Sequence, residues 1–278
     1  MRILSAEGTP LRGVTRNAAN TTALNGTVWV QADLADRKLL EPALSGTERL
    51  FLLTANKTGF GKTQIEVIQA AQELGVRHVV KLSALGASPR TRSGLAREHY
   101  EAEQALEASS MSWTILRPHA FMQNWLGELA QTVRSEGAFY AAIGEGRVPF
   151  IDTRDIAAVA AEALLHPEKH AGQRYVLTGG EAVGYAQLAS ELSEELGRKV
   201  SYRSLSMDEM RKRLESQGMA GNMIDSLLAL AAYQKAGGAT ERVSPSVNEI
   251  LGRAALSTRD FVRHHRAAFV QAEGARQS

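Results

Sequence analysis

The stretch of sequence that decides the fold is residues 8–17, GTPLRGVTRN. The expected strand in this stretch ends just before Arg16, where the second strand of a nucleotide-binding βαβ fold would end. Only seven residues precede it, where a first strand, a glycine-rich turn and a helix are expected. Residues 1–7 with Gly8 resemble the last turns of that helix and its C-terminal glycine. We therefore expect a late-started or truncated form of a longer chain. The alternative is that Met1 to Ser5 forms the first strand.

Short apolar runs then alternate with amphipathic stretches up to about residue 165. The expected strands are 11–15, 28–31, 50–53, 78–82 and 113–116, and the expected helices are 36–44, 63–74, 95–108, 122–134 and 156–165. Because apolar residues recur every three or four positions in the helices, this alternation predicts an α/β fold, a Rossmann-like doubly wound parallel sheet without its first strand and glycine-rich loop.

A looser pattern follows residue 165. A strand at 174–177 is expected to return to the sheet, and helices are expected at 185–196, 207–217 and 222–235 with one strand at 200–203. The expected domains are therefore 1–165, a cofactor-binding domain lacking its N-terminal βα unit, and 166–278, mainly a small, α-rich substrate-side lobe.

Composition narrows the class of protein. The 278 residues carry a net charge of only +2, which argues against direct nucleic-acid binding, and contain no cysteine, which excludes thiolate sites and disulfides. No apolar run is long enough to span a membrane and no signal peptide begins the chain, so we expect a cytoplasmic protein that binds small molecules. His264 and His265 lack partners at ligand spacing, so no metal site is expected.

Residues 56–63, NKTGFGKT, resemble a phosphate-binding P-loop between a strand and a helix. The match fails at its first position, where Asn56 replaces glycine, and no second motif to hold magnesium follows. We therefore disfavour an ATPase or kinase.

Two residues at strand ends point to a cofactor. Arg16 stands where NAD-preferring folds place an acidic residue, so it favours a 2′-phosphate and NADP(H), unless it is only a solvated charge. Asp33, after the next strand, would accept a hydrogen bond from the adenine amine; the alternative is helix capping ahead of Asp36.

The chain resembles NmrA-like members of the atypical short-chain dehydrogenase/reductases, close to the branch of quinone and triphenylmethane reductases. The matching segments cover most of residues 8–205. They are GTPLRGVTRN, VWVQADLAD, ALSGTERLFLLT, AAQELGVRHVVKLSALGA, HYEAEQALEASSMSWTILRPHAFMQNW, FIDTRDIAAVAAEALL and RYVLTGGEAVGYAQLASELSEELGRKVSY. The resemblance implies a Rossmann-like domain that binds NADPH across the strand ends, and a small lobe that closes over the substrate.

By position, the resemblance assigns further contacts to the cofactor. Thr54, Ala55 and Asn56 would line the ribose and nicotinamide side, with Lys57 nearby. Residues at two later strand ends would lie beside the hydride or present backbone groups to the carboxamide: Ser83, Ala84, Pro118, His119 and Ala120.

The acid/base residues of this reaction are not evident in the sequence. Tyr100 is followed four residues later by Gln104, which cannot lower the pKa of a phenol as the lysine of a Tyr-x-x-x-Lys pair would. The candidates are Ser83, Tyr100 and His119, although a packed loop histidine is an alternative for the last. His99 and Glu103 either face the cleft or form an exposed pair one helical turn apart.

Other residues of this region have structural interpretations. Arg117 is expected to anchor the following loop by hydrogen bonds. Phe121, Met122 and Trp125 would either roof an aromatic substrate pocket or pack in the core.

The expected function is therefore an NAD(P)H-dependent enzyme that reduces a small quinone- or dye-like acceptor by hydride transfer, with the proton delivered by water. The alternative is a non-catalytic NADP(H)-binding redox sensor that acts on a transcription factor or another protein partner.

Overall fold

The computed structural model describes residues 1–55, 57, 59–91 and 93–270. Contacts within the chain divide it into two compact units, residues 1–118 with 156–176, and residues 119–155 with the described part of 177–278. No helix of these described residues has the length and apolar character needed to cross a membrane.

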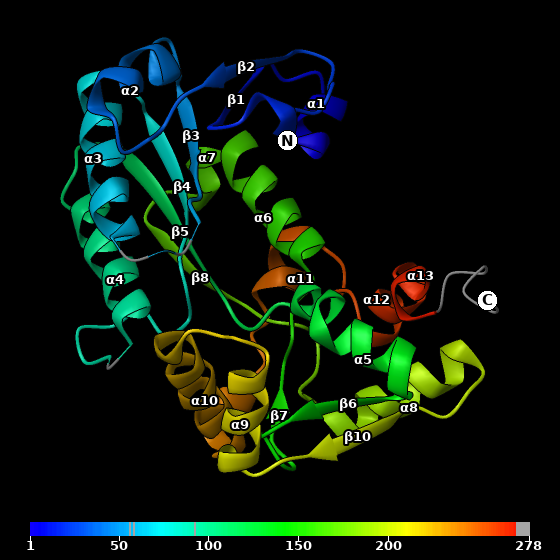
Figure 1. Cartoon of the computed structure of the whole chain (residues 1–278). Coiled ribbons are helices and arrows are strands. Elements are labelled where there is room, and N and C mark those ends of the chain that lie inside the picture. The colour runs from blue at the N-terminus through cyan, green and yellow to red at the C-terminus, as the bar shows by residue number, and fades with distance from the viewer. Residues whose placement is uncertain (56, 58, 92, 271–278) are drawn as a thin grey trace. The chain divides into compact units, whose positions relative to one another are not determined.

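The first unit contains two separate parallel β-structures (Figure 1). One is the pair β1 (Leu11–Thr15) and β2 (Thr27–Gln31), and the other has the strand order β3 (Arg49–Leu52), β4 (His78–Leu82), β5 (Ser112–Pro118), β8 (Gln173–Leu177). The strand at 173–177 therefore joins the sheet, as the sequence predicts.

The helices of the first unit are formed by the predicted amphipathic segments. Figure 1 shows α2 (Arg37–Leu44), α3 (Phe60–Glu73) and α4 (Gly94–Glu107) on one face of the four-stranded sheet and α6 (Thr153–Leu165) on the other; α1 (Arg2–Ala6), η1 (Ala18–Asn20) and α7 (Pro167–His170) are shorter. In α3, Val67, Ile68 and Ala71 are buried at the spacing of one helical face. They pack with Val79 and Ile115 of the sheet to form the core of this unit.

Residues 2–6 are helical, so the alternative that Met1 to Ser5 forms a first strand is wrong. Gly8 follows this helix at a φ of +73°, a conformation that favours glycine after a helix. Gly13 of β1 has a second kind of role. A Cβ there would lie 2.5 Å from the Trp29 ring, so only glycine lets this ring pack on β1.

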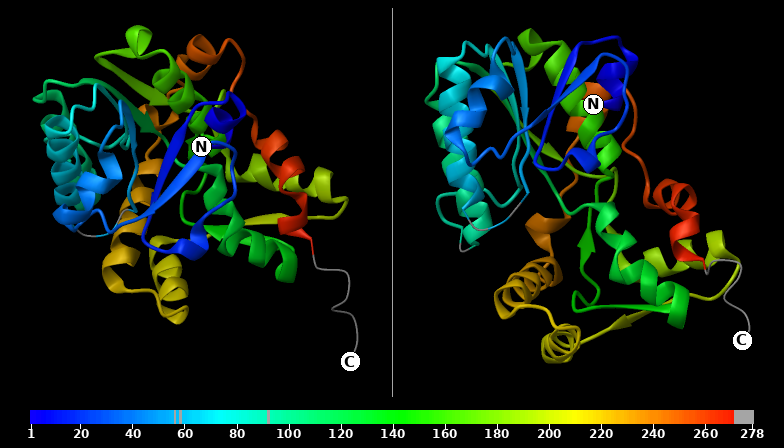
Figure 2. Two further views of the ribbon diagram at one scale, coloured as in Figure 1. Left: turned by 90° about the horizontal axis from the view of Figure 1, so that it is seen from above. Right: turned by 45° about the horizontal axis from the view of Figure 1, so that its top comes forward.

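The two β-structures are not joined by strand pairing among the described residues. Among the described residues, β1 pairs only with β2, and β3 pairs only with β4 (Figure 2). Apolar side chains of these strands are consequently exposed, including Val28 at 64%, Phe51 at 37% and the following Leu53 at 54%.

The second unit has its own small strands and a core of aromatic and aliphatic side chains. β6 (Ala138–Ala141) pairs in parallel with β10 (Ser201–Ser204), and β7 (Arg147–Val148) pairs antiparallel with β9 (Val183–Gly184). The helical elements are η2 (Met122–Leu126), α5 (Glu128–Glu136), α8 (Tyr185–Leu196), α9 (Met207–Ser216), α10 (Gly221–Lys235), η3 (Gly238–Glu241), α11 (Ser246–Leu251), α12 (Thr258–His264) and α13 (Arg266–Phe269).

Two details of this unit differ from the sequence-based expectation. The helix expected over 122–134 is broken at Gly127 into η2 and α5. Residues 119–155, expected in the first domain, cluster with the second unit because Trp125 and Phe150 pack with Phe261 in its core. The assignment of functions to the two predicted domains stays a prediction.

Candidate functional site

A cavity of about 170 Å³ lies at the carboxyl ends of β1, β2 and β3. In open parallel sheets, ligands bind at this edge. The cavity brings together five residues that the sequence assigns to cofactor binding, Arg16, Asp33, Thr54, Ala55 and Lys57. Its remaining lining residues are Val14, Thr15, Ala32, Leu34, Ala35, Leu53, Phe60 and Thr63.

Arg16 directly follows β1, and its guanidinium group has no hydrogen bond or ion pair to another described residue; only its carbonyl is used, accepting from Gln31 Nε2 at 3.2 Å. Asp33 Oδ1 accepts a hydrogen bond from the backbone N–H of Ala35 at 3.1 Å. Helix α2 is capped by Asp36, not by Asp33, so the capping alternative for Asp33 is wrong. Arg16 and Asp33 thus line the cavity as a cation and an acceptor.

The segment that resembles a P-loop binds a carboxylate of the protein itself. The backbone N–H groups of Gly59 and Gly61, at the start of α3, donate to Glu98 Oε1 and Oε2 at 3.1 and 2.7 Å. A nucleotide phosphate would need these amides. On the cavity side, Thr54 Oγ1 accepts a hydrogen bond from Gln64 Nε2 at 2.8 Å. Asn56, also predicted to bind the cofactor, lies outside the described residues.

A buried carboxylate joins α4 to the ends of β4 and β5. The side chain of Glu103 is fully buried. Its Oε1 accepts hydrogen bonds from Arg117 Nε at 2.9 Å and from the Ser83 hydroxyl, and its Oε2 accepts one from Arg117 Nη2. Arg174 lies 3.9 Å from the same carboxylate. His99 and Glu103 are both buried, so the alternative of an exposed pair is wrong, and the alternative that they face the cleft stays a prediction. Arg117 anchors α4 rather than the following loop.

A second buried contact lies next to this one. Lys81, fully buried on β4, places Nζ 3.3 Å from His99 Nδ1. Burial lowers the pKa of Lys81 to about 8 although Glu103 opposes the change, and burial with the nearby Lys81 charge lowers the pKa of His99 to about 3. His99 is therefore neutral at physiological pH. Sequence reasoning missed Lys81, although a lysine within the apolar run HVVKL was a usable signal.

The Tyr100 hydroxyl makes no hydrogen bond with any described residue, and the side chain of Gln104 donates to Glu107 at 2.9 Å. These residues are not arranged as an acid/base pair.

The other predicted residues lie at the ends of β4 and β5, outside the cavity. The carbonyl of Pro118, at the end of β5, accepts a hydrogen bond at 3.2 Å from the backbone N–H of Leu85. Leu85 directly follows Ser83 and Ala84 in the chain. The backbone N–H of His119 donates to Leu177, and that of Ala120 donates to His119 Nδ1 at 2.7 Å. These backbone groups are therefore already hydrogen-bonded.

His119 is 8% exposed, and burial lowers its pKa, so the ring is neutral. It is packed, as the structural interpretation expects. Met122 and Trp125 also pack in the core rather than lining the described cavity. No cluster of three potential metal ligands forms among the described residues.

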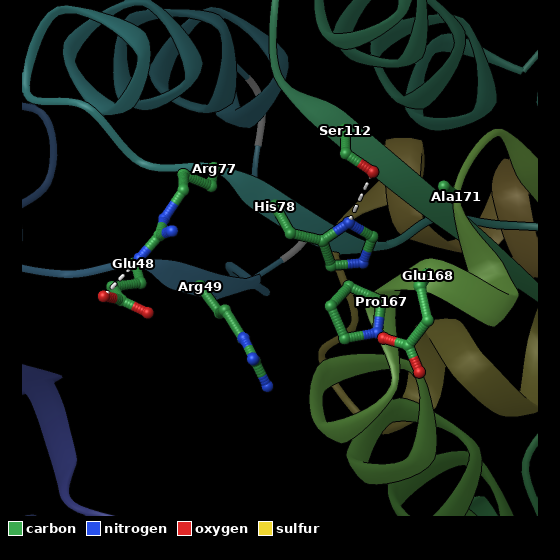
Figure 3. A pocket seen from close by; sticks show the side chains of 8 residues that line it. All are labelled: Glu48, Arg49, Arg77, His78, Ser112, Pro167, Glu168 and Ala171. Atoms are coloured by element: carbon green, nitrogen blue, oxygen red, sulfur yellow. Dashed lines mark hydrogen bonds and ion pairs between the residues drawn. The ribbon is translucent and has the colours of Figure 1, made fainter.

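A second cavity, of about 240 Å³, lies at the amino ends of β3, β4 and β5 (Figure 3). Its polar groups bind one another: Arg77 pairs with Glu48, and His78 Nδ1 lies 2.9 Å from Ser112 Oγ. Arg49 donates to the carbonyls that end α6. This edge is opposite the one at which such sheets bind ligands. We therefore assign these contacts a role in stabilising the sheet and not in binding a ligand.

Comparison with known proteins identifies the family. The model of the NmrA-like family matches residues 1–254. The NAD(P)H azoreductase of Xenophilus azovorans is 34% identical over 274 residues, covering 97% of this chain and 94% of that protein. Quinone oxidoreductase 2 of Escherichia coli is 32% identical over 254 residues, covering 90% of this chain and 87% of that protein.

The crystal structure of the NADPH-dependent quinone oxidoreductase from Escherichia coli in complex with NADPH has a similar fold, with a TM-score of 0.83, 29% identity, and coverage of 94% of this chain and 93% of that one. These matches agree with the parallel strands of the first unit and with the cavity at their carboxyl ends. The chain therefore belongs to the NmrA-like family.

Proposed function

We propose that this chain is an NAD(P)H-dependent oxidoreductase that reduces a small quinone- or dye-like acceptor by hydride transfer. The observation that carries the proposal is the cavity at the carboxyl ends of β1 to β3, where Arg16 replaces the acidic residue that NAD-preferring folds use to bind ribose hydroxyls. The similarity to an azoreductase and a quinone oxidoreductase supports the class of acceptor.

The residues present have limited chemical roles. When bound, the cofactor supplies the hydride, so the protein needs to bind and orient the reactants. Ser83 donates to the buried Glu103, the Tyr100 hydroxyl has no hydrogen-bond partner among the described residues, and the His119 ring is buried with a lowered pKa, so it does not supply a proton as an imidazolium at neutral pH. The proton that completes the reduction is therefore taken from water. For the two domains we propose that residues 1–165 bind the cofactor and residues 166–278 contribute mainly to the acceptor side.

The non-catalytic redox sensor is the second candidate. It is favoured by the same lack of an arranged acid/base group, since a sensor needs only to bind NADP(H) and present the complex to a protein partner. The two functions differ in turnover.

The test is steady-state oxidation of NADPH by the purified chain with a panel of quinones, azo dyes and triphenylmethane dyes. Acceptor-dependent loss of reduced nicotinamide absorbance would support the reductase. Binding of NADPH without turnover on any acceptor would support the sensor. Replacing Arg16 with alanine should raise KM for NADPH more than for NADH, and equal increases would remove the assignment of NADP(H).

A further inference from the structure

Lys81 is a buried cation that the proposed function does not use. It lies fully buried on β4, and within the described part of the chain its Nζ contacts only the carbonyl of Leu82 and His99 Nδ1, each at 3.3 Å. Glu103 partly opposes the lowering of the Lys81 pKa by burial, but no ion pair joins the two among the described residues. A buried cation without a paired carboxylate costs stability. Such costs are concentrated at functional sites.

The contact with Lys81 fixes the ring of His99. A charged lysine can only donate a hydrogen bond, so His99 Nδ1 accepts it and the ring proton lies on Nε2. The pKa of His99, lowered to about 3 by burial and by the Lys81 charge, keeps this ring neutral. Lys81 therefore determines both the tautomer and the orientation of His99.

His99 in turn packs against Phe60 at the start of α3. The two ring centroids lie 4.6 Å apart at an interplanar angle of 60°, which is an edge-to-face contact. Phe60 lines the cavity at the ends of β1, β2 and β3. Glu98, the neighbour of His99 on α4, accepts hydrogen bonds from the backbone N–H groups of Gly59 and Gly61, on either side of Phe60. Helix α4 therefore fixes both the ring and the backbone of this cavity residue.

The close approach of α3 and α4 leaves little freedom at this contact. A Cβ on Gly61 would lie 2.7 Å from the Cβ of Glu98 and 2.9 Å from its carbonyl oxygen, so only glycine lets the helices meet here. Phe60 is 1% exposed although it lines the cavity. Because a packed interior transmits strain, a change in the orientation of His99 is passed to the Phe60 ring.

We propose that Lys81 is a positioning residue for the cofactor, which acts through His99 to hold the Phe60 ring as a fixed wall of the cavity. This inference rests on the proposed function for the identity of the ligand, and Lys81 itself does not line the cavity. A wall held in place before binding lowers the cost of ordering the complex. Removing the buried cation should therefore raise stability and weaken cofactor binding at the same time.

The test measures stability and affinity on the same variants of the full chain. Lys81→Met should raise the urea midpoint of unfolding and weaken NADPH binding, measured by isothermal titration calorimetry, by at least about threefold. Lys169→Met is the matched control, since Lys169 is exposed on α7 and lies outside the cavity, and it should leave the affinity unchanged. A smaller loss of affinity in Lys81→Met, or a joint loss of stability and affinity as expected for a purely structural residue, would overturn the inference.

A double-mutant cycle tests whether the effect passes through Phe60. Phe60→Leu removes the ring contact with His99, so adding Lys81→Met to it should weaken NADPH binding no further. Losses that multiply independently would contradict this route. A wild type that binds NADPH but oxidises it with no acceptor would refute the reductase function alone, and the affinity ratios would still decide the role of Lys81. A wild type that does not bind NADPH would overturn both.

Discussion

Replacing Glu103 with glutamine tests whether the buried carboxylate holds the first unit together. The substitution keeps the size of the side chain and removes the charge that binds Arg117 and accepts from Ser83. Breaking a buried pair by neutralising one partner costs about 3–5 kcal/mol. Because the side chain of Arg117 is 18% exposed and water can partly solvate it, we expect a loss near 3 kcal/mol.

The measurement is urea unfolding followed by circular dichroism. With a slope of about 3 kcal/mol per molar urea, the loss lowers the midpoint by about 1 M. Glu101→Gln is the matched control, since Glu101 is exposed on the same helix and should change stability by less than about 0.5 kcal/mol.

A double variant separates the charge from the packing. Glu103→Leu with Arg117→Met removes both charges at similar volume and should recover most of the stability, because a buried ion pair is often replaced by apolar residues without loss. A loss below about 1 kcal/mol in Glu103→Gln, or a double variant no more stable than the single one, would refute this account of the cluster.

Three further substitutions test other contacts. Lys81→Met removes a buried cation whose pKa of about 8 lies below the unfolded value of about 10.4, so the unfolded state binds more protons between these values. The variant should be more stable than the wild type by about 2–3 kcal/mol near pH 7, and this advantage should shrink as the pH rises from about 8 to 10; a constant difference in urea titrations would contradict it. Glu98→Ala removes the carboxylate that caps α3 and should lower the free energy of unfolding by about 0.5–2 kcal/mol, whereas the control Glu101→Ala should leave it unchanged. Asp155→Ala leaves Leu256 N, now 2.7 Å from Asp155 Oδ2, without its acceptor, and should cost about 1–3 kcal/mol; an unchanged Tm would show that this contact is not needed.

Local periodicity explains how much of the fold was predictable. The strands at 11–15 and 78–82 and the helix at 185–196 have the bounds that the apolar pattern predicts. Each is long enough for a repeat of two or of 3.6 residues to be seen. The two-residue strands β7 and β9 are too short to show a repeat, and they form because they pair with each other.

The candidate site was predictable where it depends on strand ends. Residues after parallel strands gather at one edge, so Arg16, Asp33 and Thr54 line one cavity. The partners of buried charges were not predictable. Nothing near Glu98 in sequence indicates that it binds the amides of Gly59 and Gly61, because that contact joins two helices.

The sequence by itself determined the family, the order of strands and helices, and the basic residue at the end of β1, because these depend on local patterns and on residue type. Only the tertiary structure decided that the strands form two separate β-structures, that Glu103 binds Arg117 and Ser83, and that Glu98 caps α3. Such contacts join residues far apart in the chain, and burial then determines which charges must find partners.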